Sequence, residues 1–217
     1  MEVYNGKNND KMNIIKNPSD DDYKKIIGSL KRGELVVYPT DTIYGIAADI
    51  NNEEAVRKVF LSKKRAFDKP ISASFHDYNQ LCRYTKITEK TGDIIKKLLP
   101  GPYTLLLEKN SRVNSLLTAN TEKLGVRIPD NDVSYRLTKY FPITTTSANI
   151  TGENTPDNIN DIKNSLDNDI SVYIDGDVIK NNNASTIIDL TGQKPEIIRK
   201  TRKLDNNVRK ILKTRLI

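Results

Sequence analysis

The stretch ELVVYPTDTIYGIAADI, from Glu34 to Ile50, begins as an apolar run and continues into a cluster of small polar residues. Glu34–Tyr38 (ELVVY) has the composition of a buried β-strand. Pro39 ends that strand, and the segment Thr-Asp-Thr at 40–42 follows directly. Strand ends are where α/β folds place their ligands. The same segment also fits a capped turn that starts a short helix, so both interpretations stay open here.

Strands and helices alternate along the rest of the chain without a change in composition. Apolar spacing predicts helices at 17–33, 53–63, 77–83, 88–98, 132–140 and 157–166. Apolar runs predict strands at 71–75, 103–108, 124–128, 143–146 and 171–174, with a strand pair at 186–190 and 196–199. This alternation predicts one α/β domain around a mixed sheet, over residues 12–202. We expect residues 1–11 to be a disordered lead and residues 203–217 to form a basic helix.

The charge balance favours an acidic partner. The 217 residues include 35 Lys and Arg against 28 Asp and Glu, which gives a net charge of +7. Such a surplus suits phosphate, a nucleotide or RNA, although a Lys- and Asn-rich proteome would produce it as well. Aromatic residues make up only 6% of the chain and Trp is absent, so few stacking platforms are available and a dedicated RNA-binding module is disfavoured.

The scarcity of histidine and cysteine disfavours several chemistries. Cys82 is the only cysteine, so no intrachain disulfide can form and a reducing cytoplasm fits. His76 is the only histidine, which argues against a His/Cys zinc site and a Ser-His-Asp triad. Gly28 and Gly33 have phosphate-loop spacing, but Glu34-Leu35 stand where Lys and Ser/Thr are required. No apolar run approaches the roughly 18 residues of a membrane span, and the N-terminus lacks the apolar centre of a signal peptide. We therefore expect a cytoplasmic protein.

A basic loop follows the second predicted helix. The segment SKKRAFDKPIS, from Ser62 to Ser72, holds Lys63, Lys64, Arg65 and Lys69 within seven residues. Its proline forces a loop, so these charges are not expected on a helix face. Such a cluster can hold a polyphosphate, with arginine offering a bidentate fork. A plain exposed basic loop is the alternative.

Two strand-like segments also carry polar side chains. Arg127 lies within LGVRIP, at 124–129, among apolar neighbours. A buried arginine needs an anion, either an internal carboxylate or the carboxylate of a ligand. Nothing nearby in the sequence supplies one, so we expect Arg127 to be under-satisfied or water-paired in the empty protein. TTTSANITGENTP, at 144–156, places small hydroxyl and amide groups where another strand ends.

Six segments, taken together and in order, resemble the YrdC-domain family, the threonylcarbamoyl-AMP synthases. The resemblance covers roughly residues 12–202, and its motifs are Pro39–Gly45, Lys63/Arg65/Pro70, Pro100–Thr104, Val126–Pro129, Ser147–Asn149 and Ser185–Leu190. It implies a twisted mixed sheet with a concave basic ligand cleft. It also implies that L-threonine, bicarbonate and ATP react to give threonylcarbamoyl-AMP and pyrophosphate, with Mg²⁺ bound through the phosphates and not by side chains. A partner transferase then modifies the tRNA adenosine next to the anticodon, and tRNA or another RNA is a further possible partner.

The resemblance also implies roles for individual residues. The catalytic group comprises Lys63, Arg65, Ser147 and Asn149. ATP is held by this group together with Lys69, Lys123, Thr155 and Arg199. Threonine is held by Thr42, Ser74, Arg127, Thr145 and Ser185, with Arg127 on its carboxylate.

The chain departs from the family pattern at two of these positions. Ser74 stands where the family often has histidine, and Lys123 stands where it often has threonine. These departures bear on local contacts and not on the reaction. Two alternatives stay open: an RNA-binding module of the same fold, and a fold relative that hydrolyses or transfers a related carbamoyl compound. The intact Lys63-x-Arg65 and Ser147-x-Asn149 pairs argue against a loss of activity.

Overall fold

Strand β2 (Leu35–Tyr38) is buried on both faces of a long sheet. Leu35 and Val37 pack into one hydrophobic core, whereas Val36 and Tyr38 pack into a second one. Successive side chains of a strand point to opposite faces, so a continuous apolar run is what a strand covered on both sides requires. This confirms the strand predicted at 34–38.

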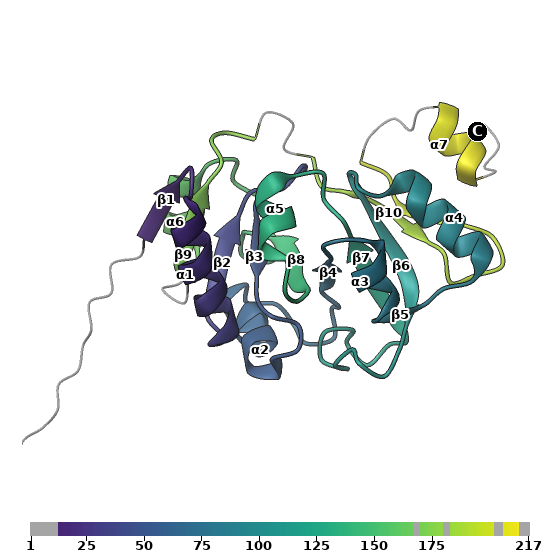
Figure 1. Cartoon of the computed structure of the whole chain (residues 1–217), viewed down its shortest axis with the longest axis horizontal. Helices are drawn as coiled ribbons and strands as arrows, with labels where there is room; N and C mark the ends of the chain where they lie inside the picture. Colours follow the sequence, from purple (N-terminus) through teal and green to yellow (C-terminus); the bar gives the residue numbers. More distant parts are fainter. Residues whose placement is uncertain (1–12, 167–169, 180–182, 202–205, 213–217) are drawn as a thin grey trace, which may run out of the picture.

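The computed structural model describes residues 13–166, 170–179, 183–201 and 206–212 (Figure 1). The other strands are β1 (Asn13–Lys16), β3 (Gly45–Ala47), β4 (Ser72–Ser74), β5 (Thr85–Lys86), β6 (Tyr103–Lys109), β7 (Lys123–Arg127), β8 (Ile143–Ser147), β9 (Ile170–Asp175), β10 (Thr186–Asp189) and β11 (Glu196–Arg199). The helices are α1 (Asp20–Lys31), α2 (Glu53–Ser62), α3 (Tyr78–Cys82), α4 (Glu89–Leu98), α5 (Asp132–Leu137), α6 (Ile159–Ser165) and α7 (Asn206–Leu212).

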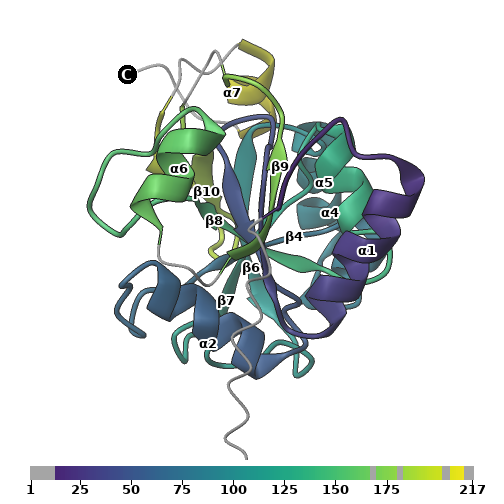
Figure 2. The ribbon, with the colours of Figure 1, turned by 90° about the vertical axis from the view of Figure 1, so that its left-hand side faces the viewer.

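The strands form one mixed sheet in the order β1-β9-β2-β3-β8-β4-β7-β6-β10-β11, and β5 pairs with β6 at the side. Four pairs are parallel: β1 with β9, β9 with β2, β4 with β7, and β6 with β10. Figure 2 shows the strong twist of the sheet, with α1 and α5 on one side and α2 and α6 on the other. A single mixed α/β sheet was predicted, and the structure confirms it.

Local signals in the sequence explain where the helices begin. Ser19 caps α1 in a capping box with Asp22. Three aspartates occupy the first turn, and their negative charges stabilise the helix at the positive end of its dipole. Asn52 caps α2 through the backbone amide of Ala55. The apolar face of α2, which includes Val56 and Phe60, then packs into the larger core. The helix predicted at 53–63 is therefore confirmed.

Three short strands escaped prediction: β1, β3 and β5. A strand of two to four residues contains too little alternation to separate it from a loop. The strand β3 also corrects the interpretation of 40–42 as the start of a short helix. Residues 41–43 form a bend, and the chain then enters β3, which pairs antiparallel with β2 and β8.

The ends of the chain are only partly described. The disordered lead predicted at 1–11 lies outside the described residues. Of the basic helix predicted at 203–217, the structure describes α7 at 206–212, whose Val208 and Leu212 belong to the larger core. In the described part of the chain, none of the helices has the length and apolar character of a membrane span.

Candidate active site

A cleft of about 310 Å³ crosses the sheet on the face formed by its middle strands. Seven neighbouring strands contribute to its lining, in the spatial order β3, β8, β4, β7, β6, β10 and β11. The residues predicted as site residues that line it are Arg65, Arg127, Thr145, Ser147, Thr155, Ser185 and Arg199. Segments that are far apart in the sequence thus meet at one cleft.

The threonine-rich strand β8 divides its hydroxyls between scaffold and cleft. The Thr144 Oγ1 donates to the Ile46 carbonyl at 2.8 Å and accepts the Ala48 amide at 2.9 Å, so it ties β8 to the chain at β3. Thr145 and Ser147, one and three positions further on, line the cleft. Small side chains here supply hydrogen-bonding groups without filling the cleft.

The loop between β2 and β3 is organised by Thr40. Its Oγ1 donates to the Ile43 carbonyl at 2.7 Å and lies 2.9 Å from the Thr42 Oγ1. The Tyr44 hydroxyl then donates to the Asp177 carbonyl at 2.7 Å and accepts the Gly176 amide at 2.9 Å. Burial raises the pKa of Tyr44 to about 12, so this hydroxyl keeps its proton. The loop is therefore held in one conformation at the edge of the cleft.

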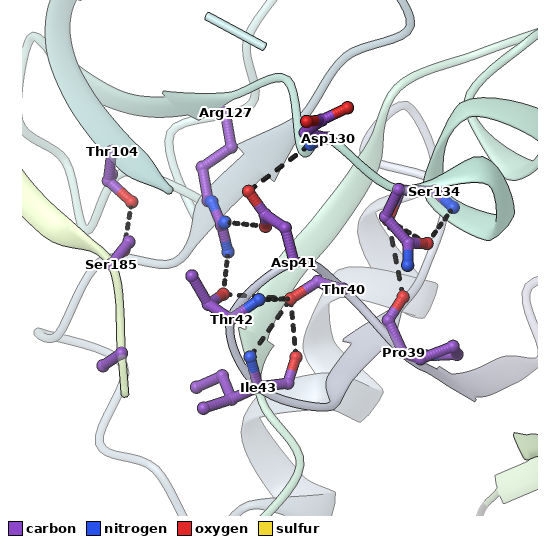
Figure 3. A network of polar contacts seen from close by, with 12 residues as sticks. Pro39, Thr40, Asp41, Thr42, Ile43, Thr104, Arg127, Asp130, Ser134 and Ser185 are labelled. Carbon is purple, nitrogen blue, oxygen red and sulfur yellow. Dashed lines mark hydrogen bonds and ion pairs between the residues drawn. The ribbon is translucent and has the colours of Figure 1, made fainter. Parts of the chain in front are cut away.

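The Arg127 fork has protein partners, which corrects the expectation of an empty or water-paired fork, whereas its Nε is under-satisfied as expected. Its Nη2 lies 2.5 Å from an Asp41 carboxylate oxygen, and its Nη1 donates to the Thr42 Oγ1 at 2.9 Å (Figure 3). The other Asp41 oxygen accepts the Asp130 amide at 3.4 Å. The Arg127 Nε is buried and makes no hydrogen bond within the described residues. Arg127 is thus oriented by the loop at 40–42 while its side chain still lines the cleft.

The other two arginines of the cleft are also held by backbone carbonyls. Arg65 donates from Nε to the Lys69 carbonyl at 3.0 Å and from Nη2 to the Pro70 carbonyl at 2.8 Å. Arg199 donates from Nε and Nη2 to the Ser185 carbonyl, at 3.2 and 2.9 Å. Burial lowers the pKa of both guanidinium groups, and Arg127 lowers that of Arg199 further. A cleft with such groups favours an anion.

Lys63 is buried beside the cleft and does not line it. Its side chain is buried, and its Nζ donates to the Ser147 carbonyl, to the Asn149 carbonyl at 2.6 Å and to the Asn149 Oδ1 at 3.2 Å. Burial lowers its pKa to about 7, with Arg65 contributing. In this structure Lys63 holds the segment 147–149, whose Ser147 lines the cleft.

The remaining predicted site residues lie beside the cleft or away from it. Thr42 is buried beneath it, next to Arg127. Ser74 is also buried, pairs with Arg127 across β4 and β7, and has an Oγ without a partner within the described chain. The Lys123 ammonium lies 2.7 Å from the Asp189 carboxylate, and Lys69 has an exposed side chain. Neither of these two lysines lines the cleft.

Three residues that shape this site were not among the predicted site residues: Asp41, Tyr44 and Thr104. Asp41 lies 86 positions from Arg127, so spacing cannot reveal the pair. Tyr44 and Thr104 line the cleft, and the Thr104 Oγ1 lies 2.7 Å from the Ser185 Oγ. The signal for Tyr44 and Thr104 is their position inside two of the segments that resemble the family motifs, Pro39–Gly45 and Pro100–Thr104.

The cleft offers a metal ion no side-chain cage. Within the described residues, no group of three His, Cys, Asp or Glu side chains is placed to bind a metal. Carboxylate oxygens are the side-chain ligands that Mg²⁺ takes, and the residues that line the cleft include neither Asp nor Glu. A magnesium ion in this cleft would have to be coordinated by oxygens of a molecule bound in the cleft.

The family resemblance predicts that replacing Arg65 with alanine weakens ATP binding. We expect a change of about 10- to 150-fold, because a charge-assisted hydrogen bond to a phosphate contributes about 1.5–3 kcal/mol and the Arg65 Nη1 is left to make it. Calorimetric titration with ATP measures the change. Lys64→Ala, which removes an exposed charge from the same loop, is the matched control and should have little effect. An ATP affinity unchanged in Arg65→Ala would make the segment 62–72 a plain basic loop.

Known proteins match this chain in sequence and in structure. The profile of the Sua5/YciO/YrdC family, described as "Telomere recombination", matches residues 28–201. The chain belongs to the Sua5/YciO/YrdC family. A Methanocaldococcus jannaschii protein with the provisional name threonylcarbamoyl-AMP synthase is 36% identical over 180 residues, which is 81% of this chain and 86% of that protein.

Two matches from Pyrococcus abyssi add to the family assignment. A threonylcarbamoyl-AMP synthase is 33% identical over 175 residues, which cover 79% of this chain and 52% of that protein. The solved structure of P. abyssi Sua5 complexed with L-threonine superposes with a TM-score of 0.85 at 29% identity, over 93% of this chain and 60% of the Sua5 chain. This Sua5/YciO/YrdC domain thus spans little more than half the length of these two relatives.

Proposed function

We propose that this protein is a threonylcarbamoyl-AMP synthase, which joins L-threonine, bicarbonate and ATP and releases pyrophosphate. The observation that carries the proposal is the cleft itself: three arginines and a set of small hydroxyls face one space. Relatives from archaea, bacteria and eukaryotes carry the name threonylcarbamoyl-AMP synthase. The reading as an RNA-binding module without this activity has no such support.

The chemistry needs alignment and charge neutralisation and no covalent nucleophile. Adenylation joins a carboxylate oxygen to the α-phosphate of ATP, while pyrophosphate leaves. A protein accelerates such a step by holding two ligands in line and by offsetting the charge that develops. Arginines with immobilised forks meet the second requirement, because their dipoles and charges need little reorganisation.

We assign threonine to the half of the cleft around Arg127. Arg127 would bind the threonine carboxylate, and Thr145 and Ser185 would contact the rest of the amino acid. Thr42 orients Arg127 through the bond to its Nη1. Ser74 would complete this half, because its buried Oγ lacks a partner in the described chain.

We assign ATP to the half of the cleft around Arg65, Ser147, Thr155 and Arg199. Lys63 and Asn149 would support this half by holding the segment 147–149 in place. Lys69 and Lys123 are weaker candidates, because one is exposed and the other is ion-paired with Asp189. Magnesium would arrive with ATP and be held by its phosphates.

The product carries a mixed anhydride between a carbamate and a phosphate, so an acceptor must take over its threonylcarbamoyl group. We propose that a partner transferase passes this group to the tRNA adenosine next to the anticodon. Direct contact between this chain and tRNA is compatible with the net charge of +7. Neither partner is needed for the synthase step itself.

Pyrophosphate release should require threonine and bicarbonate together. Serine lacks one methyl group, and a missing methyl group in a pocket reduces kcat/KM by about 10- to 200-fold. The measurement is a coupled pyrophosphate assay with ATP, with each amino acid in turn, and with bicarbonate present or removed. Equal turnover with serine, or full turnover without bicarbonate, would rule out this substrate assignment.

A further inference from the structure

The charges of the cleft are of one sign. Arg65, Arg127 and Arg199 line it, and neither Asp, Glu nor Lys does so within the described residues. The Asp41 carboxylate, which lies beside the cleft, is already paired with the Arg127 guanidinium and accepts the Asp130 amide. The cleft therefore has a place for a carboxylate but no carboxylate for an ammonium group.

This arrangement matters because free threonine near neutral pH carries both charges. Its carboxylate would meet Arg127, whereas its ammonium group would enter a cleft that Arg65 and Arg199 also line. A nearby like charge and burial both disfavour a charged amine. Arg199 shows the same effect on the protein side, because burial and Arg127 lower the pKa of its guanidinium group. Asp41 offsets one of the three arginines and leaves two.

We infer that the nucleotide-free cleft selects threonine with its amine deprotonated, and that the ammonium proton leaves to solvent as the amino acid binds. The inference rests on the proposed function and deepens it. The lining also suits a neutral amine, which donates two hydrogen bonds and accepts one. Hydroxyls such as those of Thr145, Ser147 and Thr104 can serve in either direction.

Deprotonation is what the first chemical step needs. A neutral amine attacks the bicarbonate carbon with its lone pair, and a nitrogen–carbon bond forms. A carbon–oxygen bond breaks, and the departing hydroxide leaves with an amine proton as water, so the product is the N-carboxylate. A carbamate oxygen then attacks the α-phosphorus and pyrophosphate leaves. An ammonium group has no lone pair, so a cleft that bound the zwitterion would hold an unreactive substrate.

The test is calorimetric titration of the nucleotide-free protein with L-threonine at pH 7.5, in buffers of different ionisation enthalpy. Linkage predicts release of about one proton for each threonine bound, and an affinity that rises about tenfold per pH unit below the pKa of the free amine. Binding without proton release, or an affinity independent of pH, would overturn the inference while leaving the proposed function intact.

The control ligand is 2,3-dihydroxybutanoate, in which a hydroxyl replaces the amine of threonine. It keeps the carboxylate for Arg127 and carries no ammonium proton, so its binding should release none. Release of the same proton with this ligand would show that a protein group, such as Lys63, is the source, and would also overturn the inference. If threonine does not bind the nucleotide-free protein, the inference is overturned, and the pyrophosphate assay decides the proposed function separately.

Discussion

Replacing Arg127 with lysine should raise the KM for threonine about 10- to 150-fold, because the hydrogen bonds of a charged fork to a carboxylate contribute about 1.5–3 kcal/mol. Lysine keeps the positive charge but loses the planar fork. In this structure the two Nη atoms of the fork donate to Asp41 and to Thr42. A single ammonium group cannot place its donors in the positions of both Nη atoms. ATP affinity should barely change. Pyrophosphate release measured against threonine, with calorimetry for ATP, checks both statements.

Asp41→Asn separates the two roles of Arg127. Asparagine keeps the shape of Asp41 and removes its charge, so Arg127 loses its ion pair but not its place in the cleft. We expect a smaller rise in the threonine KM than in Arg127→Lys. The double variant should be less than additive, because residues in direct contact couple by about 0.5–3 kcal/mol.

The opposite pattern would change the interpretation. If Arg127→Lys lowers the unfolding midpoint and leaves the threonine dependence intact, Arg127 is an internal ion-pair partner of Asp41 and not a substrate ligand. Strict additivity of the two substitutions would show that Asp41 does not position Arg127.

Most of the sheet could be predicted because its strands carry their own signal. The apolar run of β2 and the periodic Val56 and Phe60 of α2 depend on local spacing, and burial in two cores satisfies that spacing directly. The strand β3 has three residues, too few for alternation to show. Its existence follows from pairing with β2 and β8, which the local sequence does not contain.

The site could be predicted as a set of residues but not as a set of contacts. Composition alone groups Lys63 with Arg65 and Lys69 in one basic loop, yet Lys63 is buried and Lys69 is exposed. The reason lies in the backbone: Lys63 caps the end of α2, and Lys64 takes a left-handed conformation with φ 47°. The chain turns at that point, so neighbouring lysines point in different directions. The Asp41–Arg127 pair is likewise a product of tertiary folding.

Lys63→Met should cost about 2 kcal/mol or more in the free energy of unfolding, because it removes the lysine donor from two buried acceptors and each buried acceptor left without a partner costs about 1–3 kcal/mol. The two acceptors are the Asn149 carbonyl and the Asn149 Oδ1, whereas the Ser147 carbonyl also accepts the Asn149 amide at 3.0 Å. Methionine fills a similar volume, so the lost hydrogen bonds and not a cavity dominate the change. Lys64→Met, at an exposed position of the same loop, is the control and should leave stability nearly unchanged. Equal unfolding free energies for the wild-type protein and Lys63→Met would contradict a supporting role.

The same lysine makes a pH-dependent contribution to stability whose sign can be derived. Its pKa is about 7 in the folded protein against 10.5 for a free side chain, so between these values the unfolded chain binds more protons at this position. The unfolding free energy therefore rises with pH across that window. The cost of the buried charge is full below about pH 7 and is relieved as the group loses its proton. Denaturant unfolding from pH 6.5 to 9.5 should show this rise in the wild-type protein and a flatter profile in Lys63→Met. Parallel profiles would mean that Lys63 keeps its charge throughout, held by the acceptors of the segment 147–149.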